Sequence, residues 1–301
     1  MKIIIRTHNW QLPWQAKLPE YLTTKGHSTM TTNGIIQEDN FKPDVVIHMW
    51  SDGSSHPSDY PEAKHIYYMR RYEFFSPEWR KLDWLKIDHM VFVNGEIKNA
   101  VDGWLKENSL KTPTSLIYNC VDLKDWTIIH AKDKTYNIGM VCSIHPKKNI
   151  PLALQILDAL PEKYTLHLAG PQQDNCLTEY LNHMAIQMKR RFNYYGKLPR
   201  KRLDSWWDMM DCCLSTSISE GNPNNIIEAM AKGIKPVVHN WPGAVNQFPT
   251  DYVFNSISEA VDIIEDKDIS PMNARGWVED RYSLNNFDKL YDVIMYDKIA
   301  I

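Results

Sequence analysis

The chain has 301 residues, a formal net charge of −3 at pH 7 and a hydrophobic content of 43%. This hydrophobic content excludes a largely disordered chain, and the length suggests about two domains. The small net charge excludes a general attraction to nucleic acid or anionic lipid. The longest apolar runs are short, such as residues 45–47, so we predict no membrane span.

The first residues and the cysteines indicate the compartment. Charge appears at Lys2 and again at Arg6, so we expect a first strand at the N-terminus and not a signal peptide. The five cysteines are odd in number and scattered, without a C-x-x-C motif. This pattern fits reduced thiols and argues against structural zinc, so we predict a cytoplasmic protein.

The first part of the chain alternates predicted strands and helices. Runs of Val and Ile predict buried strands, and the segments between them carry apolar residues at helical spacing. We expect strands at 2–6, 44–49, 65–69, 89–93 and 114–118, and helices at 13–25, 77–86 and 96–107. This order predicts a doubly wound α/β domain over residues 1–118. No G-x-G-x-x-G follows the first strand, which disfavours a dinucleotide-dependent dehydrogenase.

The second part repeats the pattern after a charged, irregular segment. We expect this segment, 119–135, to be a linker. Strands are then predicted at 136–142, 164–169, 191–195, 212–214 and 234–239, with helices at 150–160, 177–189, 200–210 and from 226. A second α/β domain is therefore expected over 136–271, followed by an amphipathic helical tail from 272.

Residues 217–233 predict a binding site. An apolar strand ends there, the chain breaks over Gly, Asn and Pro residues, and a helix begins. Backbone N–H groups at such a helix start suit a phosphate or a sugar hydroxyl. Glu220 precedes the turn and Glu228 lies within the helix, so two carboxylates can accept hydrogen bonds from one polyol. The plainer alternative is an ordinary strand-loop-helix unit with solvated glutamates.

The run Ser219-Glu220-Gly221 with Glu228-Ala229-Met230-Ala231-Lys232-Gly233 resembles the Glu-x7-Glu signature of the family-4 retaining glycosyltransferases. Tyr118-Asn119-Cys120-Val121-Asp122 resembles the hinge of that family, with Cys where Gly is usual. The resemblance covers most of the second domain and, more loosely, the first. It implies the GT-B fold: two Rossmann-like doubly wound domains facing a cleft, with a C-terminal helix over 272–301 that crosses back to the first domain.

The resemblance also implies roles for individual residues. The first Glu of the motif contacts the donor sugar and the second binds the nucleotide ribose, so Glu220 is expected to be catalytic and Glu228 to bind the donor. The backbone between them is expected to hold sugar and phosphate. This segment comprises Gly221, Asn222, Pro223, Asn224 and Asn225.

A basic clamp for the diphosphate is expected in the second domain. Lys148 matches the Lys of the Arg-x4-Lys clamp of the family and is expected to be catalytic, but Ser143 stands at the Arg position. Lys147 or a basic residue among 200–202 could replace that Arg, or the diphosphate is held weakly. Retaining enzymes of this fold are thought to react on one face of the sugar, with help from the leaving phosphate, so we expect no metal and no cofactor.

Candidate groups in the first domain are less specific. His48 is a candidate catalytic residue, although a histidine on a buried strand is more often a satisfied core residue. The candidate acceptor-cleft residues are His8, Trp10, Arg70, Arg71 and Glu73.

We therefore expect a retaining glycosyltransferase that moves a sugar from a nucleotide-diphosphate sugar to a glycan or a lipid-linked acceptor. Peripheral contact with a membrane is left open. One alternative is a transferase that modifies hydroxymethylated bases of phage DNA, with the basic clusters of 70–86 and 189–202 along the duplex. Another is a catalytically silent sugar-nucleotide binder, which the missing clamp Arg would allow.

Overall fold

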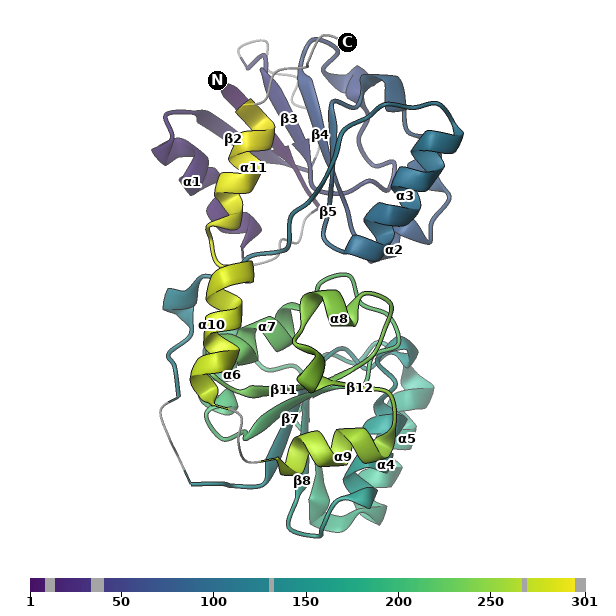
Figure 1. Cartoon of the computed structure of the whole chain (residues 1–301), viewed down its shortest axis with the longest axis vertical. Coiled ribbons are helices and arrows are strands. Elements are labelled where there is room, and N and C mark those ends of the chain that lie inside the picture. Colours follow the sequence, from purple (N-terminus) through teal and green to yellow (C-terminus); the bar gives the residue numbers. More distant parts are fainter. Residues whose placement is uncertain (9–13, 34–40, 130–132, 267–269, 296–301) are drawn as a thin grey trace. The chain divides into compact units, whose positions relative to one another are not determined.

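The computed structural model describes residues 1–8, 14–33, 41–129, 133–266 and 270–295. The chain divides into two units, one of Met1–Val121 with Tyr282–Ile301 and the other of Asp122–Arg281. Each unit contains a six-stranded sheet with helices packed on it (Figure 1). All the paired strands in the described ranges are parallel, which confirms the prediction of two doubly wound α/β halves.

The sheet of unit 1 has the order β2-β1-β3-β4-β5-β6. Its strands are β1 (Lys2–Arg6), β2 (Ser28–Thr32), β3 (Val45–His48), β4 (Lys64–Met69), β5 (His89–Phe92) and β6 (Thr114–Leu116). Every residue of β3 is buried because helices cover both faces of the sheet. From β1 the chain goes to β2 on one side of β1, and it then returns to form β3 on the other side of β1. The carboxyl ends of β1 and β3 therefore flank a topological switch point, where ligands bind in sheets of this kind.

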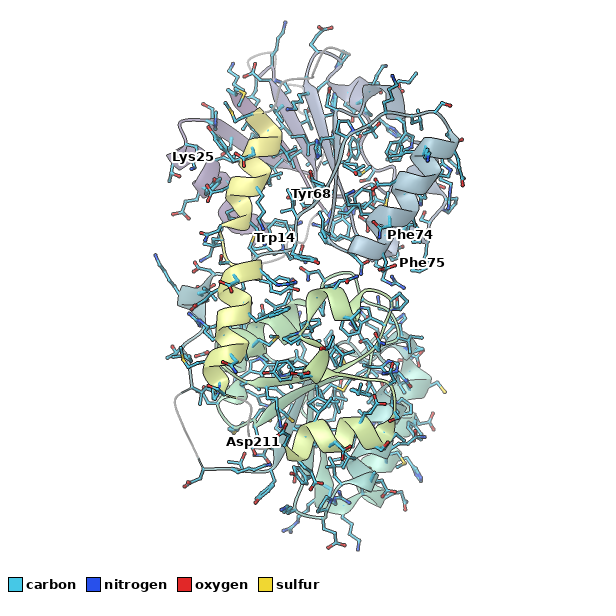
Figure 2. All side chains as sticks on the ribbon, viewed as in Figure 1. Trp14, Lys25, Tyr68, Phe74, Phe75 and Asp211 are labelled. Carbon is cyan, nitrogen blue, oxygen red and sulfur yellow. The ribbon has the colours of Figure 1, made fainter. Side chains whose placement is uncertain are left out.

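Apolar faces of helices cover this sheet on both sides. Leu18 and Leu22 of α1 (Leu18–Thr24) pack on one face together with Leu290 and Ile294 of α11 (Asn286–Met295). Trp14 and Tyr68, both labelled in Figure 2, belong to the same cluster and have ring centroids 6.1 Å apart. The residues Ile97, Val101 and Leu105 of α3 (Gly95–Glu107), four apart in sequence, pack on the other face.

The sheet of unit 2 has the order β12-β11-β10-β7-β8-β9. Its strands are β7 (Asn137–Val141), β8 (Thr165–Ala169), β9 (Phe192–Tyr194), β10 (Cys212–Ser215), β11 (Lys235–His239) and β12 (Val253–Phe254). Counted from β7, this is the strand order of a Rossmann sheet. Its switch point lies between β7 and β10, so the loops that follow these two strands are the expected ligand-binding loops.

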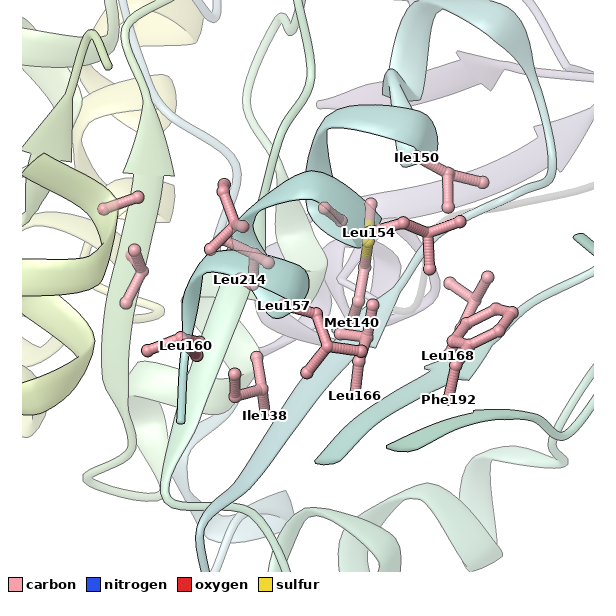
Figure 3. Packing of buried hydrophobic residues seen from close by; sticks show 14 of the residues in the cluster. Ile138, Met140, Ile150, Leu154, Leu157, Leu160, Leu166, Leu168, Phe192 and Leu214 are labelled. Atoms are coloured by element: carbon pink, nitrogen blue, oxygen red, sulfur yellow. The ribbon is translucent and has the colours of Figure 1, made fainter. Parts of the chain in front are cut away.

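Seven α-helices are described in unit 2. They are α4 (Ile150–Ala159), α5 (Asn175–Gln187), α6 (Arg200–Trp207), α7 (Asn224–Ala231), α8 (Ala244–Gln247), α9 (Ile257–Glu265) and α10 (Pro271–Tyr282). Leu154 and Leu157 of α4 pack on Ile138 and Leu166 of the sheet (Figure 3). On α6, Trp207 packs closely against β7: a Cβ at Gly139 would lie 2.6 Å from the Trp207 ring. Glycine at this position therefore permits the close approach of α6 to the sheet.

Two predicted elements differ in the structure. The helix predicted at 77–86 is replaced by two 3-10 helices, Glu78–Lys81 and Trp84–Lys86. The indole N–H groups of Trp79 and Trp84 donate to the carbonyls of Phe74 and Trp79, each at 3.1 Å, and Leu82 between the turns is extended. Such side-chain contacts with the backbone compete with a continuous helix. The elements β2, α2 (Arg71–Phe74), α8, β12 and α9 were not predicted.

The tail and the predicted linker are also divided differently between the units. The tail forms two helices, of which α10 lies in unit 2 and α11 in unit 1. Arg275 of α10 donates to the carbonyl of Trp126 at 3.0 Å, and Ile129 N donates to the carbonyl of Lys232 at 2.8 Å. These bonds attach both α10 and residues 122–129 to unit 2, whereas the sequence suggested a linker over 119–135 and a tail from 272. Among the described helices, none combines the length and the apolar character that crossing a bilayer requires.

Candidate functional site

Two loops lie at the switch point of unit 2, one after β7 and one after β10. The backbone N–H of Ile218 donates to the carbonyl of Lys147 at 2.9 Å. The hydroxyl of Thr216 donates to the carbonyl of Lys148 at 2.8 Å. Because these hydrogen bonds join the two loops, side chains 72 residues apart in sequence meet at the carboxyl edge of the sheet.

The loops bring Lys148 and Glu220 into an ion pair. The ammonium of Lys148 contacts Oε1 of Glu220, and the hydroxyl of Ser217 donates to the same oxygen at 2.7 Å. The side chains of Lys148 and Glu220 are only 13% and 12% exposed. A cation and a carboxylate held together in this way can bind a ligand that carries a negative group beside hydroxyl groups.

Glu228 lies on α7 and pairs with a basic residue from another helix. Oε1 of Glu228 accepts a hydrogen bond from Nη1 of Arg200, the first residue of α6, at 2.7 Å. Nη2 of Arg200 lies 3.6 Å from Oδ2 of Asp125, and the guanidinium stacks over Trp126 at 4.9 Å. Burial raises the pKa of Glu228, and the positive charge of Arg200 opposes that shift.

The segment before α7 is fixed by amide side chains. Gln247 of α8 accepts from Asn222 Nδ2 at 2.9 Å and donates from Nε2 to the carbonyl of Gly221 at 2.8 Å. Asn225 Nδ2 donates to the carbonyl of Val141, at the end of β7, at 2.7 Å. Pro223 is the N-cap residue of α7, and Asn224 is the first residue of the helix. The side-chain amides of Asn222 and Asn225 therefore bind protein groups and determine where the backbone of this segment lies.

Of the two positions of the expected diphosphate clamp, Lys148 carries a positive charge and Ser143 does not. Lys148 lies in the 3-10 helix Pro146–Lys148, and Ser143 is half-buried in the loop after β7. Lys147 is exposed, and its backbone N–H donates to Nδ1 of His145 at 3.2 Å. Arg200, one of the expected substitutes for the missing Arg, contacts Glu228.

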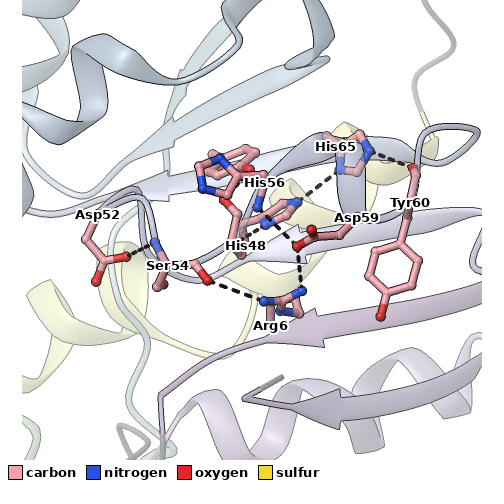
Figure 4. A network of polar contacts seen from close by, with 10 residues as sticks. Arg6, His48, Asp52, Ser54, His56, Asp59, Tyr60 and His65 are labelled. Carbon is pink, nitrogen blue, oxygen red and sulfur yellow. Dashed lines mark hydrogen bonds and ion pairs between the residues drawn. The ribbon is translucent and has the colours of Figure 1, made fainter. Parts of the chain in front are cut away.

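His48 lies in a buried chain of hydrogen bonds in unit 1 (Figure 4). Its Nδ1 is 2.6 Å from the hydroxyl of Ser55, and its Nε2 is 2.9 Å from Nδ1 of His65, whose Nε2 is 3.0 Å from the carbonyl of Tyr60. Since a carbonyl only accepts, His65 Nε2 carries a proton, His48 Nε2 donates to His65, and Ser55 donates to His48. Burial, together with the nearby His65 and Arg6, lowers the pKa of His48 well below its usual value. His48 is therefore a neutral, fully buried group in contact with Tyr67, and Ser55 separates it from the surface pocket.

Arg70 and Glu73 are also buried in unit 1. Arg70 donates to the carbonyl of Met49 and lies over the ring of Trp50 at 4.4 Å. Burial raises the pKa of Glu73, and the charge of Arg70 opposes the shift. Arg71 lies over the ring of Phe75 at 5.2 Å, and Trp10 lies outside the described residues.

His8 borders a small polar pocket of about 30 Å³ at the switch point of unit 1. Its Nε2 is 2.9 Å from Oδ2 of Asp52, and its ring centroid is 5.0 Å from that of Trp50. The pocket is lined by Arg6, Thr7, His8, Asn33, Trp50, Ser54 and Ser55. Among the expected acceptor residues, the structure thus brings His8 to the carboxyl edge of the sheet, and it buries both Arg70 and Glu73.

Sequence reasoning missed the contacts made by Gln247 and Arg200. Gln247 lies in a helix of four residues that no pattern predicted. The position of Arg200 could have been noticed in the sequence. A cluster of basic residues at the start of a helix opposes the helix dipole, which suggests that these residues have partners elsewhere. No group of three or more potential metal-ligating side chains occurs in the part of the chain that the structure describes.

Comparisons with known proteins bear on the fold and on unit 2. Residues 135–262 match the family model described as Glycosyl transferases group 1, and this segment contains Lys148, Arg200, Glu220 and Glu228. A search of curated proteins finds no match.

Solved structures with the same architecture include Anabaena HepE in complex with UDP and glucose, which is 14% identical with a TM-score of 0.73 over 97% of this chain and 98% of that one. The apo form of the lipopolysaccharide outer core galactosyltransferase WaaB is 14% identical, with a TM-score of 0.71 over 98% and 99%. Sucrose-phosphate synthase from Thermosynechococcus elongatus is 11% identical, with a TM-score of 0.70 over 96% and 98%. These likenesses confirm the Rossmann-like GT-B fold.

Proposed function

We propose that the chain is a retaining glycosyltransferase that transfers a sugar from a nucleoside-diphosphate sugar to a glycan or a lipid-linked acceptor. The observation that carries the proposal is the Lys148–Glu220 pair at the switch point of a Rossmann sheet, within the segment that matches the glycosyl transferase model. In a nucleotide sugar the diphosphate is bonded directly to the sugar. A cation for the diphosphate and a carboxylate for the sugar hydroxyls must therefore be neighbours, as Lys148 and Glu220 are.

Each charged group then has a role in the transfer. The bond from the anomeric carbon to the diphosphate oxygen breaks, and the acceptor oxygen bonds to the same carbon on the same face. The acceptor proton passes to the leaving phosphate. Lys148 stabilises the negative charge that grows on the diphosphate, and Glu220 orients the sugar through its hydroxyls. Glu228 binds the hydroxyls of the ribose, and catalysis requires no metal.

The choice of acceptor follows from the charges of unit 1. Binding to a duplex needs a face of uncompensated basic residues. Lys81 is paired with Glu78 at 2.7 Å, and Lys86 lies 3.5 Å from Asp83. Arg70 is buried, so three of the five basic residues of 70–86 contribute little to an external positive field. This favours a glycan or lipid-linked acceptor over DNA. Submicromolar affinity for duplex DNA that falls steeply when the salt concentration is raised would reverse the choice.

The proposal is tested by thermal stabilisation with UDP, GDP and ADP and their glucose conjugates, followed by donor hydrolysis. UDP is the first probe because HepE was solved with UDP. Glu228→Ala should weaken nucleotide affinity by about 10- to 100-fold, because a charge-assisted hydrogen bond is lost. The matched control is Glu162→Ala, on the exposed surface of unit 2.

Three outcomes would contradict the proposal in different ways. Equal affinity in Glu228→Ala and wild type would remove the ribose assignment. Binding without turnover on any acceptor would favour a silent sugar-nucleotide binder, consistent with Ser143 at the position expected for Arg. A product with the opposite anomeric configuration, measured by NMR, would exclude retention.

A further inference from the structure

Helices α6 and α7 are joined by two sets of oppositely charged side chains. Arg200, Asp204 and Asp208 are four residues apart and share one face of α6 and its C-terminal cap. Glu228 and Lys232 are likewise four apart on α7 and its cap. Nη1 of Arg200 lies 2.7 Å from Oε1 of Glu228, and the Lys232 ammonium contacts Asp204 and lies 2.8 Å from Oδ1 of Asp208.

The order of these charges determines which residue of α6 faces Glu228. A shift of α6 by one turn would place Asp204 opposite Glu228, and two like charges at that distance repel. The side chain of Lys232 is 1% exposed, so its ion pairs are screened less than surface pairs are. The Lys232 pairs therefore anchor α6 to α7 in the one register that holds Arg200 against Glu228.

Arg200 lies where the energetics of the helix disfavour a cation. It is the first residue of α6, two more basic residues follow it, and the first turn has no acidic residue. A cation at a helix N-terminus is destabilising, because the helix dipole places partial positive charge there. Helix stability therefore does not account for Arg200, whereas its contacts with Glu228, Asp125 and the Trp126 ring do.

The contact occupies one of the two oxygens of Glu228. Oε1 accepts from Arg200, and Oε2 has no hydrogen-bond partner among the described residues. We propose that Arg200 is a positioning residue of the donor site, which keeps Glu228 ionised and turned so that Oε2 accepts the two vicinal hydroxyls of a nucleoside-diphosphate ribose. This inference rests on the proposed function, because it concerns how that donor site is held ready for its ligand.

The charged groups around Glu228 allow a test by pH. Arg200 from α6 favours the carboxylate, while burial and Asp125 from the 3-10 helix Leu123–Asp125 favour the protonated form. The thiol of Cys213 on β10 is a further titratable neighbour. The carboxyl group of Glu228 has to be ionised to accept hydrogen bonds from both ribose hydroxyls. Nucleotide affinity should therefore fall as the pH drops through the pKa of Glu228, and removal of Arg200 should raise that pKa further.

The experiment compares UDP, GDP and ADP binding by calorimetry from pH 5 to pH 9 in wild type, Arg200→Ala, Arg200→Lys and Lys163→Ala. Lys163 is an exposed basic residue of unit 2 outside the candidate site. Arg200→Ala should bind the nucleotide about tenfold more weakly at pH 7, with its loss of affinity on acidification displaced to higher pH. Arg200→Lys should keep the pH profile of wild type, because the charge is retained, with a smaller loss of affinity. Lys163→Ala should match wild type throughout.

A double variant, Arg200→Ala with Glu228→Gln, shows whether Arg200 acts through Glu228. Its pH profile should show only the fall in affinity that protonation of the terminal phosphate of the nucleotide causes, since such a phosphate titrates at about pH 6. An unshifted profile in Arg200→Ala, or tighter binding at all pH values, would overturn the inference and leave the proposed function intact. Failure of wild type to bind any of the three nucleotides would overturn both.

Discussion

The ion pairs of Lys232 allow a test of what stabilises unit 2. Removing the two aspartates should lower the free energy of unfolding more than removing Lys232 does. Its side chain is 1% exposed, whereas those of Asp204 and Asp208 are 40% and 52% exposed. Asp204→Ala with Asp208→Ala leaves a buried ammonium without a carboxylate. Lys232→Met leaves two carboxylates that water already reaches.

The magnitude follows from that asymmetry. Removal of the partners of a buried charge costs about 3–5 kcal/mol in free energy of unfolding. We expect about 3 kcal/mol for the double Asp variant, because the exposed surroundings of Asp204 and Asp208 let water approach Lys232. Lys232→Met should cost less than about 1 kcal/mol, since an apolar side chain of similar length fills the same volume and the lost pairs are partly solvated.

The assay is urea unfolding followed by tryptophan fluorescence, with Trp206 and Trp207 of α6 as buried reporters in unit 2. The transitions of the two units are fitted separately where they do not coincide. A triple variant that combines Lys232→Met with both Asp→Ala changes should recover most of the stability. Equal losses in the two variants, or a larger loss in Lys232→Met, would refute the reasoning.

Three further predictions concern catalysis and pH. Glu220→Ala should reduce turnover and discrimination between donor sugars while nucleotide affinity stays within about threefold of wild type; equal losses for nucleotide and nucleotide sugar would contradict the assigned roles. Turnover should persist in excess chelator, because Lys148 supplies the positive charge, and a strict requirement for Mg²⁺ or Mn²⁺ would contradict this. Burial lowers the pKa of His48 and lowers that of His89 to about 4, so the unfolded chain binds more protons below its His pKa of about 6.5. Unit 1 should therefore lose stability as the pH falls from 6.5 toward 4, measured as a lower urea midpoint, and a midpoint unchanged over that range would contradict the assignment.

The sequence predicted the elements that carry the proposed donor site because each has a strong local pattern. The apolar run at 212–214 followed by Gly and Pro residues predicts the strand and the turn, and Ile226, Ile227 and Met230 predict the face of α7. The contact of Glu228 with Arg200, 28 residues away, leaves no such pattern, because it depends on how α6 packs on α7.

The local sequence pattern also gave a wrong prediction of secondary structure where side chains form hydrogen bonds with the backbone. At 77–86 the composition permits a helix, but the indoles of Trp79 and Trp84 bind backbone carbonyls and the segment breaks into two short turns. His48 was identified as a candidate because of its type and its strand. Its neutral state follows from Ser55 and His65, partners that the tertiary structure alone brings to it.

The two points at which the chain passes between the units lie beside each other, and this makes unit 2 an inserted domain. The backbone N–H of Val121 donates to the carbonyl of Tyr282 at 2.7 Å, and the rings of Tyr118 and Tyr282 are 5.2 Å apart. Residues 122–281 thus enter and leave unit 1 at a single place. A gene encoding only those residues should yield a folded fragment, and a short Gly-Ser bridge from Val121 to Tyr282 should close unit 1 without it. The chain is therefore a natural starting point for exchanging whole inserted domains within an unchanged host fold.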